Sequence, residues 1–593
     1  MNAKLLYRLA WCAFLALALT NLLLYNHAAM FWDEDETAYA GFARTMLHTG
    51  NWTIPNFMWC DIHRKTPLHF WAIALCFRLF GETEFAARLP SVLAYVAMLA
   101  SLYVMGARIW GRERVAWAVV VLTSSLLVPN VAKIGVTDSG LLLNETWVVL
   151  AIANLLRADL KVRARWFYVG LFWAAVAFGL LLKGPPVLVV AGGMCALLVF
   201  VHPRGWQLWK LYPVVGLPLA MLPLFAWGYM AWQADGGKFI TWLWDWYVWK
   251  RVSGEKNVVT DTWKGPAGYH FAIFIGSFLV WLPLLFSSLT EWLRRTVRYA
   301  RDYVRVWRAV GASGFWWKGS TDAALAAKAG LDGETVFFFA WLVWAWVFYE
   351  ISPSKLPAYS IAAQPALALL IAARGLRLRT VVATAGERTW GVLLCILLLI
   401  VSSALGFFGI RFFGGEGGST VAPLAFSLWV GGLATAVALF GAGRYVLPIA
   451  ALNGLLFSFW AWAMVVPMIE HKRDSTRRAA QAAAALNHDA NRRKIETLVF
   501  CVEPGTALPS LVYYAQPHFD TLRTLGSTAE SDYYYYRKST VFLTDSASMV
   551  RLKPFLIRDS IPYTIIPIWI IDRQRTDSYM IFRSAPKPAT NNQ

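Results

Sequence analysis

Charged residues are scarce in this chain of 593 residues. Asp, Glu, Lys and Arg together make up 15% of the sequence, compared with about 25% in an average soluble domain. Cysteine is also rare, since 6 residues are too few for a disulfide scaffold of this length. Apolar residues make up 58%, which excludes a disordered chain because disorder requires low hydrophobicity. The composition therefore indicates a polytopic membrane protein.

Apolar runs recur along the chain at lengths that suit a bilayer. A spanning helix needs about 20 mostly apolar residues. The runs centre on 9–24, 85–106, 115–130, 140–156, 166–182, 186–201, 211–231, 270–289, 335–349, 356–373, 389–409, 421–441 and 446–468. They predict about thirteen transmembrane helices. The first run could also be a signal peptide, but no small-residue cleavage site leads from it into soluble sequence, so we expect a retained helix.

The loop charges predict the orientation of these helices. Basic residues outnumber acidic ones by 55 to 35, and they fall in short runs between apolar segments, which argues against nucleic-acid binding. A cytoplasmic N-terminus requires basic connections after the even-numbered helices. Such connections occur at 108–114, 157–165, 204–210, 290–330 and 374–379. An odd number of helices then places the C-terminus outside.

Two regions face the outer side in this topology. Residues 27–84 form a loop within a transmembrane domain of residues 1–469, and residues 470–593 have a soluble composition. In the tail, 497–502, 539–544 and 563–568 have the composition of strands, and 475–487 resembles an Ala-rich helix. We therefore expect a small C-terminal α/β domain.

Acidic residues cluster where the chain leaves the membrane. Four consecutive acids, 33–36, follow the first apolar run, and a second acid, Asp138, stands at the outer start of the fourth. Each position could simply cap a helix, because Asp and Glu suit the first turn. An ionisable group at this depth is also a functional candidate, and Asp35 and Asp138 could share one cavity. We expect the helix after the acids, with Phe42 and Met46 on one side, to lie in the membrane interface.

Several cations are predicted at the same outer level, where the topology rule disfavours them. They are Lys65, Lys183, Arg251 and Lys355, and an aromatic stretch at 242–249 accompanies them. Each cation alone could snorkel, and the aromatic residues could form an interface belt or stack on sugars. Acids and bases gathered at one membrane face suit a substrate with a phosphate head and a lipid tail.

Short motifs occur in a fixed order in about the first 375 residues. They are DETAYA (35–40), MLHTGNW (46–52), RKTPLHFW (64–71), LFGETEFAARLP (79–90), LKGP (182–185), SKLPAY (354–359) and PALALL (365–370). Together they resemble the motifs of bacterial membrane glycosyltransferases with the GT-C fold. The resemblance is to the lipid A aminoarabinose transferases and their relatives among the protein mannosyltransferases.

This resemblance implies sugar transfer from a polyprenyl (undecaprenyl) phosphate donor on the periplasmic side of a bacterial inner membrane, with aminoarabinose and a lipid A phosphate as the first expectation. It implies three catalytic residues, Asp35, Glu36 and Asp138. It implies substrate contacts at Tyr39, Lys65, Arg88 and Tyr359, beside the cations Lys183, Arg251 and Lys355.

The chain departs from the family pattern at three positions. The motif Arg is Ala38, and Arg64 and Trp263 replace a Glu and a His that resemble a metal-binding pair in some members. Divalent metals need carboxylate or imidazole ligands, so these changes argue against a bound metal and leave the sugar open.

The expected reaction is displacement at the anomeric carbon, with the lipid phosphate as leaving group. Asp35 would act as base towards a hydroxyl acceptor, or would orient a phosphate acceptor that is already ionised.

Two other functions remain as alternatives. One is transfer of mannose, galacturonate or another sugar to protein or glycan. The other is transport of a lipid-linked sugar. Transporters often have inverted repeats and ionisable groups near the bilayer midplane, and the sequence shows neither feature.

Overall fold

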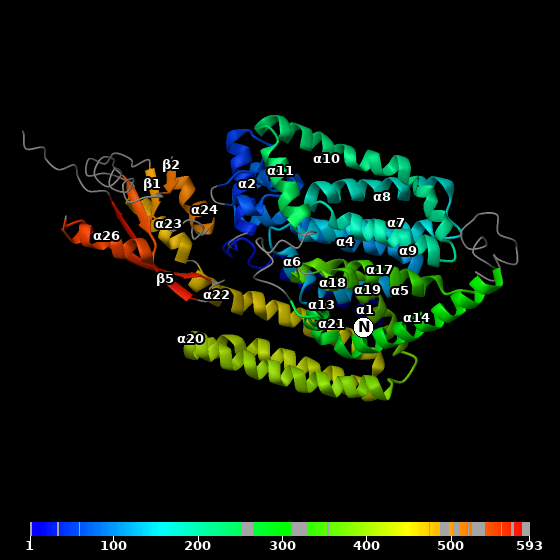
Figure 1. Cartoon of the computed structure of the whole chain (residues 1–593). Helices are drawn as coiled ribbons and strands as arrows, with labels where there is room; N and C mark the ends of the chain where they lie inside the picture. Colours follow the sequence, from blue (N-terminus) through cyan, green and yellow to red (C-terminus); the bar gives the residue numbers. More distant parts are fainter. Residues whose placement is uncertain are drawn as a thin grey trace, which may run out of the picture.

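The structure of the protein is a computed structural model. The structure describes residues 3–32, 35–57, 60–250, 265–310, 330–352, 355–473, 475–486, 497–501, 509–519, 521–524, 540–558, 560–570 and 575–583. A long helical bundle is followed by a small α/β unit at one of its ends (Figure 1). This arrangement confirms the predicted fold class, a polytopic helical membrane protein with a small C-terminal α/β domain.

The bundle is built from nineteen helices in the described ranges. They are α1 (Ala3–Leu23), α2 (Asp35–Thr49), α3 (Leu68–Phe80), α4 (Glu84–Trp110), α5 (Arg112–Thr123), α6 (Val128–Ala132), α7 (Asp138–Leu155), α8 (Val162–Lys183), α9 (Pro186–Val201), α10 (Pro213–Asp235), α11 (Lys238–Trp244), α13 (Tyr269–Ser277), α14 (Leu282–Val310), α17 (Gly333–Leu342), α18 (Phe348–Ile351), α19 (Gln364–Arg377), α20 (Ala385–Gly441), α21 (Val446–Trp460) and α22 (Val466–Arg473). Short 3-10 or π turns include η1 (Asp61–His63), η3 (Asp245–Trp249), η5 (Val343–Val347) and η6 (Pro357–Ala363).

Within the described residues, eight helical segments are long and apolar enough to cross a membrane, or nine if α13 and α14 form one span bent by 82°. The eight are Glu84–Trp110, Val162–Lys183, Pro213–Asp235, Gly333–Ile351, Pro357–Arg377, Ala385–Arg411, Gly417–Gly441 and Gly443–Glu470. Three shorter apolar helices, at Cys12–Leu23, Leu68–Phe80 and Pro186–Val201, accompany them. The protein is therefore a multi-pass membrane protein, and the count of thirteen spans stays a prediction.

α20 is a hairpin of two spans rather than one continuous helix. Its backbone departs from helical geometry at Gly414, where φ is +71°. A residue with a Cβ rarely adopts this conformation, so glycine permits the reversal. The predicted runs 389–409 and 421–441 fall on the two arms.

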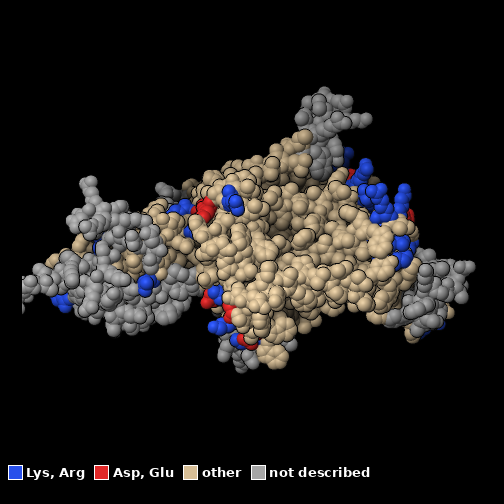
Figure 2. Space-filling model, turned by 90° about the horizontal axis from the view of Figure 1, so that it is seen from above, with Lys and Arg blue, Asp and Glu red and all other residues tan. Residues whose placement is uncertain are grey.

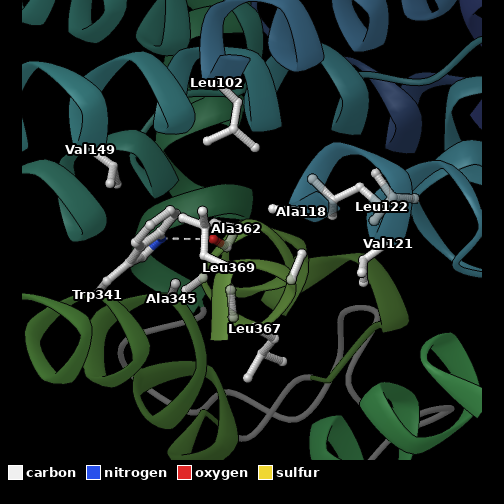
Figure 3. Close-up of a cluster of buried hydrophobic side chains, with 14 of the residues drawn as sticks. Leu102, Ala118, Val121, Leu122, Val149, Trp341, Ala345, Ala362, Leu367 and Leu369 are labelled. Carbon is white, nitrogen blue, oxygen red and sulfur yellow. Dashed lines mark hydrogen bonds between the residues drawn. The ribbon is translucent and has the colours of Figure 1, made fainter. Parts of the chain in front are cut away.

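The centre of the bundle is filled by small and branched side chains. Leu102 of α4, Leu122 of α5, Val149 of α7 and Leu369 of α19 are all buried in one cluster (Figure 3). Trp341 of α17 also lies there, and its indole Nε1 donates to the Ala362 carbonyl over 2.8 Å. That bond satisfies the one polar atom of a buried indole, so the large ring can sit in the core.

The C-terminal unit contains a five-stranded sheet with the order β2-β1-β3-β5-β4. Its elements are α23 (Ser475–Ala485), β1 (Thr497–Cys501), α24 (Pro509–Ala515), η9 (Gln516–His518), β2 (Thr521–Thr524), β3 (Val541–Thr544), α26 (Ser546–Arg558), β4 (Tyr563–Ile570) and β5 (Arg575–Arg583). β1 is parallel to β2 and β3, whereas β5 is antiparallel to β3 and β4. Alternate residues of β1 enter different clusters, Leu498 and Phe500 on the α23 side and Val499 on the α26 side.

The α2 helix is enclosed by protein, which corrects our expectation that it lies in the membrane interface. Phe42 and Met46 are buried in a hydrophobic cluster that also contains Ala479 of α23 and Leu511 of α24. The Phe42 ring packs against Phe70 of α3, 5.1 Å between ring centroids, and α24 contacts α2 at Arg44, which donates to the Tyr513 carbonyl. Sequence periodicity shows that a helix face is apolar but not what will cover it.

Charge is distributed unevenly on the surface. Figure 2 shows a wide belt free of charged side chains on the face in view, and Lys and Arg gathered at the end away from the C-terminal unit. α14 runs to that end of the bundle (Figure 1) and exposes Arg294, Arg295 and Arg298.

Candidate functional site

Asp35 is the first residue of α2, at the end of the bundle next to the C-terminal unit. Its side chain is 49% exposed. The carboxylate Oδ1 lies 2.9 Å from His63 Nδ1, and Oδ2 lies 3.6 Å from Lys65 Nζ. The positive end of the α2 dipole adds to this favourable environment for a negative charge.

Tyr39 lies one turn further along α2 and on the same side as Asp35, as residues four apart do. Its ring is fully buried against Phe70 and His69. Its hydroxyl accepts a hydrogen bond from Lys65 Nζ. Burial, with a smaller contribution from Asp35, raises the pKa of Tyr39 well above its usual value. Tyr39 therefore stays neutral and holds the Lys65 ammonium beside the Asp35 carboxylate.

Asp138 and Lys183 form a second charged pair. Asp138 begins α7, Lys183 ends α8, and Lys183 Nζ donates to Asp138 Oδ1 over 2.5 Å. Both side chains are about 15% exposed, at 14% and 15%. The Tyr359 ring of η6 lies 5.8 Å from Lys183 Nζ, which places the tyrosine of the SKLPAY motif beside this pair.

The two pairs belong to one electrostatic site. Lys183 contributes to lowering the pKa of Asp35, and Asp138 contributes to raising the pKa of Tyr39. Groups must lie close together in a protein interior to act on one another in this way. We refer to Asp35, Tyr39, Lys65, Asp138 and Lys183 as the acid–lysine cluster. The fold thus brings together the two acids that the sequence separates by about one hundred residues.

The pKa of Asp35 is held well below its usual value near 3.8. Loss of surrounding water alone would raise the pKa, but the Lys65 ammonium and the hydrogen bond with His63 outweigh that effect. Asp35 is therefore an ionised carboxylate and a weak base.

Glu36 has a different environment, although it is adjacent in sequence. Its side chain is 1% exposed and is bound bidentately by Arg88, at 2.8 Å to Oε1 and 3.1 Å to Oε2. The backbone N–H of Trp32 donates to Oε2 over 2.8 Å, and that of Gly135 donates to Oε1 over 2.7 Å. Arg88 also donates to three backbone carbonyls, of Asn26, Ala29 and Met30. These bonds occupy the hydrogen-bonding groups of both side chains and tie distant segments together. The catalytic role of Glu36 and the substrate contact of Arg88 stay predictions.

The bonds of Glu36 also fix the loop that precedes Asp138. The Gly135 carbonyl lies 3.0 Å from His69 Nε2, while its N–H is bound by Glu36. A Cβ at Gly135 would lie 3.2 Å from the Ala87 carbonyl oxygen and 3.4 Å from Glu36 Oε1. We refer to Glu36, Arg88 and Gly135 as the Glu36 brace. It ties α2, α4 and the start of α7 together, and so sets the position of Asp138 relative to Asp35.

Lys355 lies in a neighbouring cluster rather than in contact with Asp35. Its ammonium is 3.0 Å from the Pro266 carbonyl and 3.3 Å from Glu350 Oε1. The same Glu350 accepts from the backbone N–H of His270 over 3.0 Å. The side chain of Lys355 is 7% exposed. Arg251 lies outside the described residues.

Three residues at these sites escaped the sequence analysis. His63 contacts Asp35, and its place just before the RKTPLHFW motif was a usable signal. Glu350 is an acid at the end of an apolar helix, which is a functional signal in itself. Glu145 is 2% exposed and lies two turns along α7 from Asp138, so it shares the side of α7 that carries the cluster.

No three His, Cys, Asp or Glu side chains gather as metal ligands in the part of the chain that the structure describes. In the described ranges, which leave out residues 33–34, the Asp35 carboxylate contacts the His63 imidazole and lies beside the Lys65 ammonium. Arg64, at the position of the motif Glu, pairs with Asp61 over 2.7 Å, and Trp263 lies outside the described residues. Among the described residues, an imidazole and an ammonium around one carboxylate do not make a ligand set for a divalent cation.

The sequence is similar to known glycosyltransferases. The family model for dolichyl-phosphate-mannose-protein mannosyltransferase matches residues 64–229. The undecaprenyl phosphate-alpha-4-amino-4-deoxy-L-arabinose arabinosyl transferase of Serratia proteamaculans (strain 568) is 25% identical over 66% of this chain and 65% of its own length. The protein of the same name from Pseudomonas aeruginosa (strain LESB58) is 27% identical over 65% and 63%. The matched part of each relative is thus less than two thirds of that protein.

The fold is also that of a solved structure. ArnT from Cupriavidus metallidurans bound to undecaprenyl phosphate superposes with a TM-score of 0.69, at 18% identity, over 96% of this chain and 97% of that one. The predicted GT-C type of fold is therefore confirmed. The resemblance to aminoarabinose transferases and protein mannosyltransferases, inferred from the motifs, is confirmed as well.

Proposed function

We propose that this protein is a glycosyltransferase that moves a sugar from an undecaprenyl phosphate donor to an acceptor at the periplasmic face of a bacterial inner membrane. The observation that carries the proposal is the acid–lysine cluster, in which two carboxylates and two ammonium groups meet at one end of the bundle. The names of the relatives support the donor class and favour aminoarabinose as the sugar and a lipid A phosphate as the acceptor.

In the proposed reaction an acceptor oxygen attacks the anomeric carbon of the donor sugar. The bond from that carbon to the lipid phosphate breaks, and the electron pair leaves with the phosphate. Lys65 and Lys183 stabilise the charge on the leaving group, because each presents an ammonium at the cluster. Lys355 and Tyr359 of the SKLPAY segment remain candidates for binding the lipid phosphate. Arg251, which follows the aromatic segment 242–249, is a third candidate.

The charge state of Asp35 favours a phosphate acceptor. A general base works best when its pKa is near the working pH, whereas the pKa of Asp35 is held below its usual value. A phosphate nucleophile is already ionised and needs no base. Asp35 would then orient the reacting groups and stabilise positive charge that develops on the sugar ring.

The distribution of charge supports one orientation in the membrane. The end that exposes the arginines of α14 suits the cytoplasm, and the cluster lies at the opposite end beside the C-terminal unit (Figures 1 and 2). We therefore propose a cytoplasmic N-terminus and a periplasmic C-terminal unit, with residues 1–469 and 470–593 as the two domains.

Mass spectrometry of lipid A from a deletion strain, complemented with wild type or Asp35→Asn, tests the proposal. We expect the aminoarabinose modification to be lost on deletion and restored by wild type only. The variant should fold normally and lose about 10²–10³-fold in turnover, as when one oriented electrostatic group is removed. Restoration by Asp35→Asn would contradict the role of Asp35.

A second candidate acceptor is protein or another glycan, because the matched family model describes protein mannosyltransferases. The same strains separate the two cases. Unchanged lipid A together with a different sugar missing from surface glycans would reassign donor and acceptor. Lipid-linked sugar accumulating on the cytoplasmic leaflet, with no sugar missing elsewhere, would instead indicate transport.

A further inference from the structure

A cavity lies between the bundle and the C-terminal unit. It has a volume of about 240 Å³ and is lined by residues of α2, the α3–α4 junction, α23, α24 and η9. The lining residues that matter here are Arg44, Glu84, Arg477, Gln481, Tyr514 and His518. None of the site residues expected from the sequence lines this cavity, although Glu82 and Glu84 belong to the LFGETEFAARLP motif.

The walls of the cavity are held in place by ion pairs that join distant segments. Arg44 of α2 binds Glu82 over 2.7 Å and donates to the Tyr513 carbonyl over 2.7 Å. Arg477 of α23 binds Glu84 of α4 over 2.6 Å. Tyr514 donates to the same carboxylate over 2.9 Å. Both walls are therefore fixed before any ligand arrives, which lowers the entropic cost of binding.

The chemistry of the lining favours an uncharged polar ligand. Its two arginines are each neutralised by a glutamate, so the cavity offers no excess positive charge to a phosphate or carboxylate. Paired guanidinium and carboxylate groups still offer donors and acceptors in fixed directions, and the exposed amide of Gln481 offers both. Tyr514 adds an aromatic surface. A sugar ring, with many hydroxyl groups and an apolar face, matches this combination.

The size and position of the cavity also suit one sugar ring. Its volume lies below the range of about 300–1,000 Å³ that is usual for drug-sized ligands. Arg44 is nine residues from Asp35, which is two and a half turns, so the two side chains leave α2 on opposite sides about 13 Å apart along its axis. The cavity is thus separate from the acid–lysine cluster but within reach of a substrate longer than one sugar.

We propose that this cavity binds a sugar ring of the acceptor, outside the group that is glycosylated. The assignment to an acceptor rests on the proposed glycosyltransferase function, whereas the binding of a sugar does not. The C-terminal unit then contributes directly to acceptor recognition, through Gln481 and Tyr514.

The first test is saturation-transfer NMR on the full chain in nanodiscs, with N-acetylglucosamine as the probe. Gln481→Trp would fill the cavity, and Ala485→Trp adds a similar ring one turn along α23, outside the lining. We expect signal transfer in wild type and Ala485→Trp and its loss in Gln481→Trp, without competition from inorganic phosphate. No transfer in wild type, equal transfer in Gln481→Trp, or displacement by phosphate would overturn the proposal.

The second test separates the two proposals. In an assay with lipid A as acceptor, Gln481→Trp should raise the acceptor KM about tenfold, the effect of losing 1.4 kcal/mol of binding. Ala485→Trp should leave the KM unchanged. Asp35→Asn should lose turnover but keep the NMR signal. An unchanged acceptor KM in Gln481→Trp would refute the acceptor assignment, whereas absence of any transfer by wild type would refute only the glycosyltransferase function.

Discussion

The acid–lysine cluster and the Glu36 brace begin at neighbouring residues of α2 and differ in what surrounds them. Asp35 is half exposed and shares its partners with solvent, whereas Glu36 is buried and accepts four hydrogen bonds from the protein. Adjacent helical residues point about 100° apart, so one acid faces the open site and the other faces the interior. The cluster has spare capacity for a substrate, and the brace has none.

Glu36→Ala is expected to have the largest effect on stability and tests the difference between the two acids most directly. It leaves Arg88 as an uncompensated buried charge, which should cost about 3–5 kcal/mol of stability. Thermal unfolding of the purified protein would show a large drop in Tm, together with poor expression. Asp35→Asn is the matched control and should keep a Tm close to wild type. Equal stability of the two variants would mean that the two acids do not differ as described.

A smaller effect is expected from Gly135→Ala, which acts on the link between the two regions. The added methyl would press on the Ala87 carbonyl and Glu36, and overpacking of this kind costs about 1–3 kcal/mol. Because Gly135 precedes Asp138, turnover should fall while the donor KM changes little. Gly170→Ala is the control, since a Cβ at that position of α8 meets nothing within 4 Å. An unaltered turnover in Gly135→Ala would separate the brace from the geometry of the cluster.

The smallest effect is expected from His63→Ala, measured as pH dependence. His63 helps to lower the pKa of Asp35, so its removal should raise that pKa. A carboxylate whose pKa is lower in the folded protein stabilises the fold above its unfolded-state pKa, and this contribution is lost as pH falls through the folded-state pKa. The acid limb of stability and of kcat/KM should therefore move to higher pH in the variant. A limb that stays in place or moves to lower pH would show that His63 does not favour the ionised form.

Much of this architecture could be predicted from the sequence. Apolar runs predicted the long helices, and the strand-type composition of 497–502, 539–544 and 563–568 predicted β1, β3 and β4. The acids and lysines of the cluster were singled out by their chemistry and motifs, although their catalytic and binding roles stay predictions.

Other features depend on contacts between distant segments. The pairing of Glu36 with Arg88 joins α2 to α4, and nothing in the local sequence distinguishes that carboxylate from Asp35 except its direction from the helix. α2 also contacts α24 through Arg44 and Tyr513, and α24 lies more than four hundred residues further along the chain. Such contacts are set by tertiary packing rather than by local pattern.

The shared cluster between α2 and the C-terminal unit has a consequence for biosynthesis. The ribosome makes α2 early and α24 late, so Arg44 of α2 can reach the Tyr513 carbonyl only after the whole bundle has been made. The contacts between α2 and the C-terminal unit can therefore form only after the tail has been made and has folded. Completion of the chain, rather than insertion of its first helices, is then the step after which these contacts form.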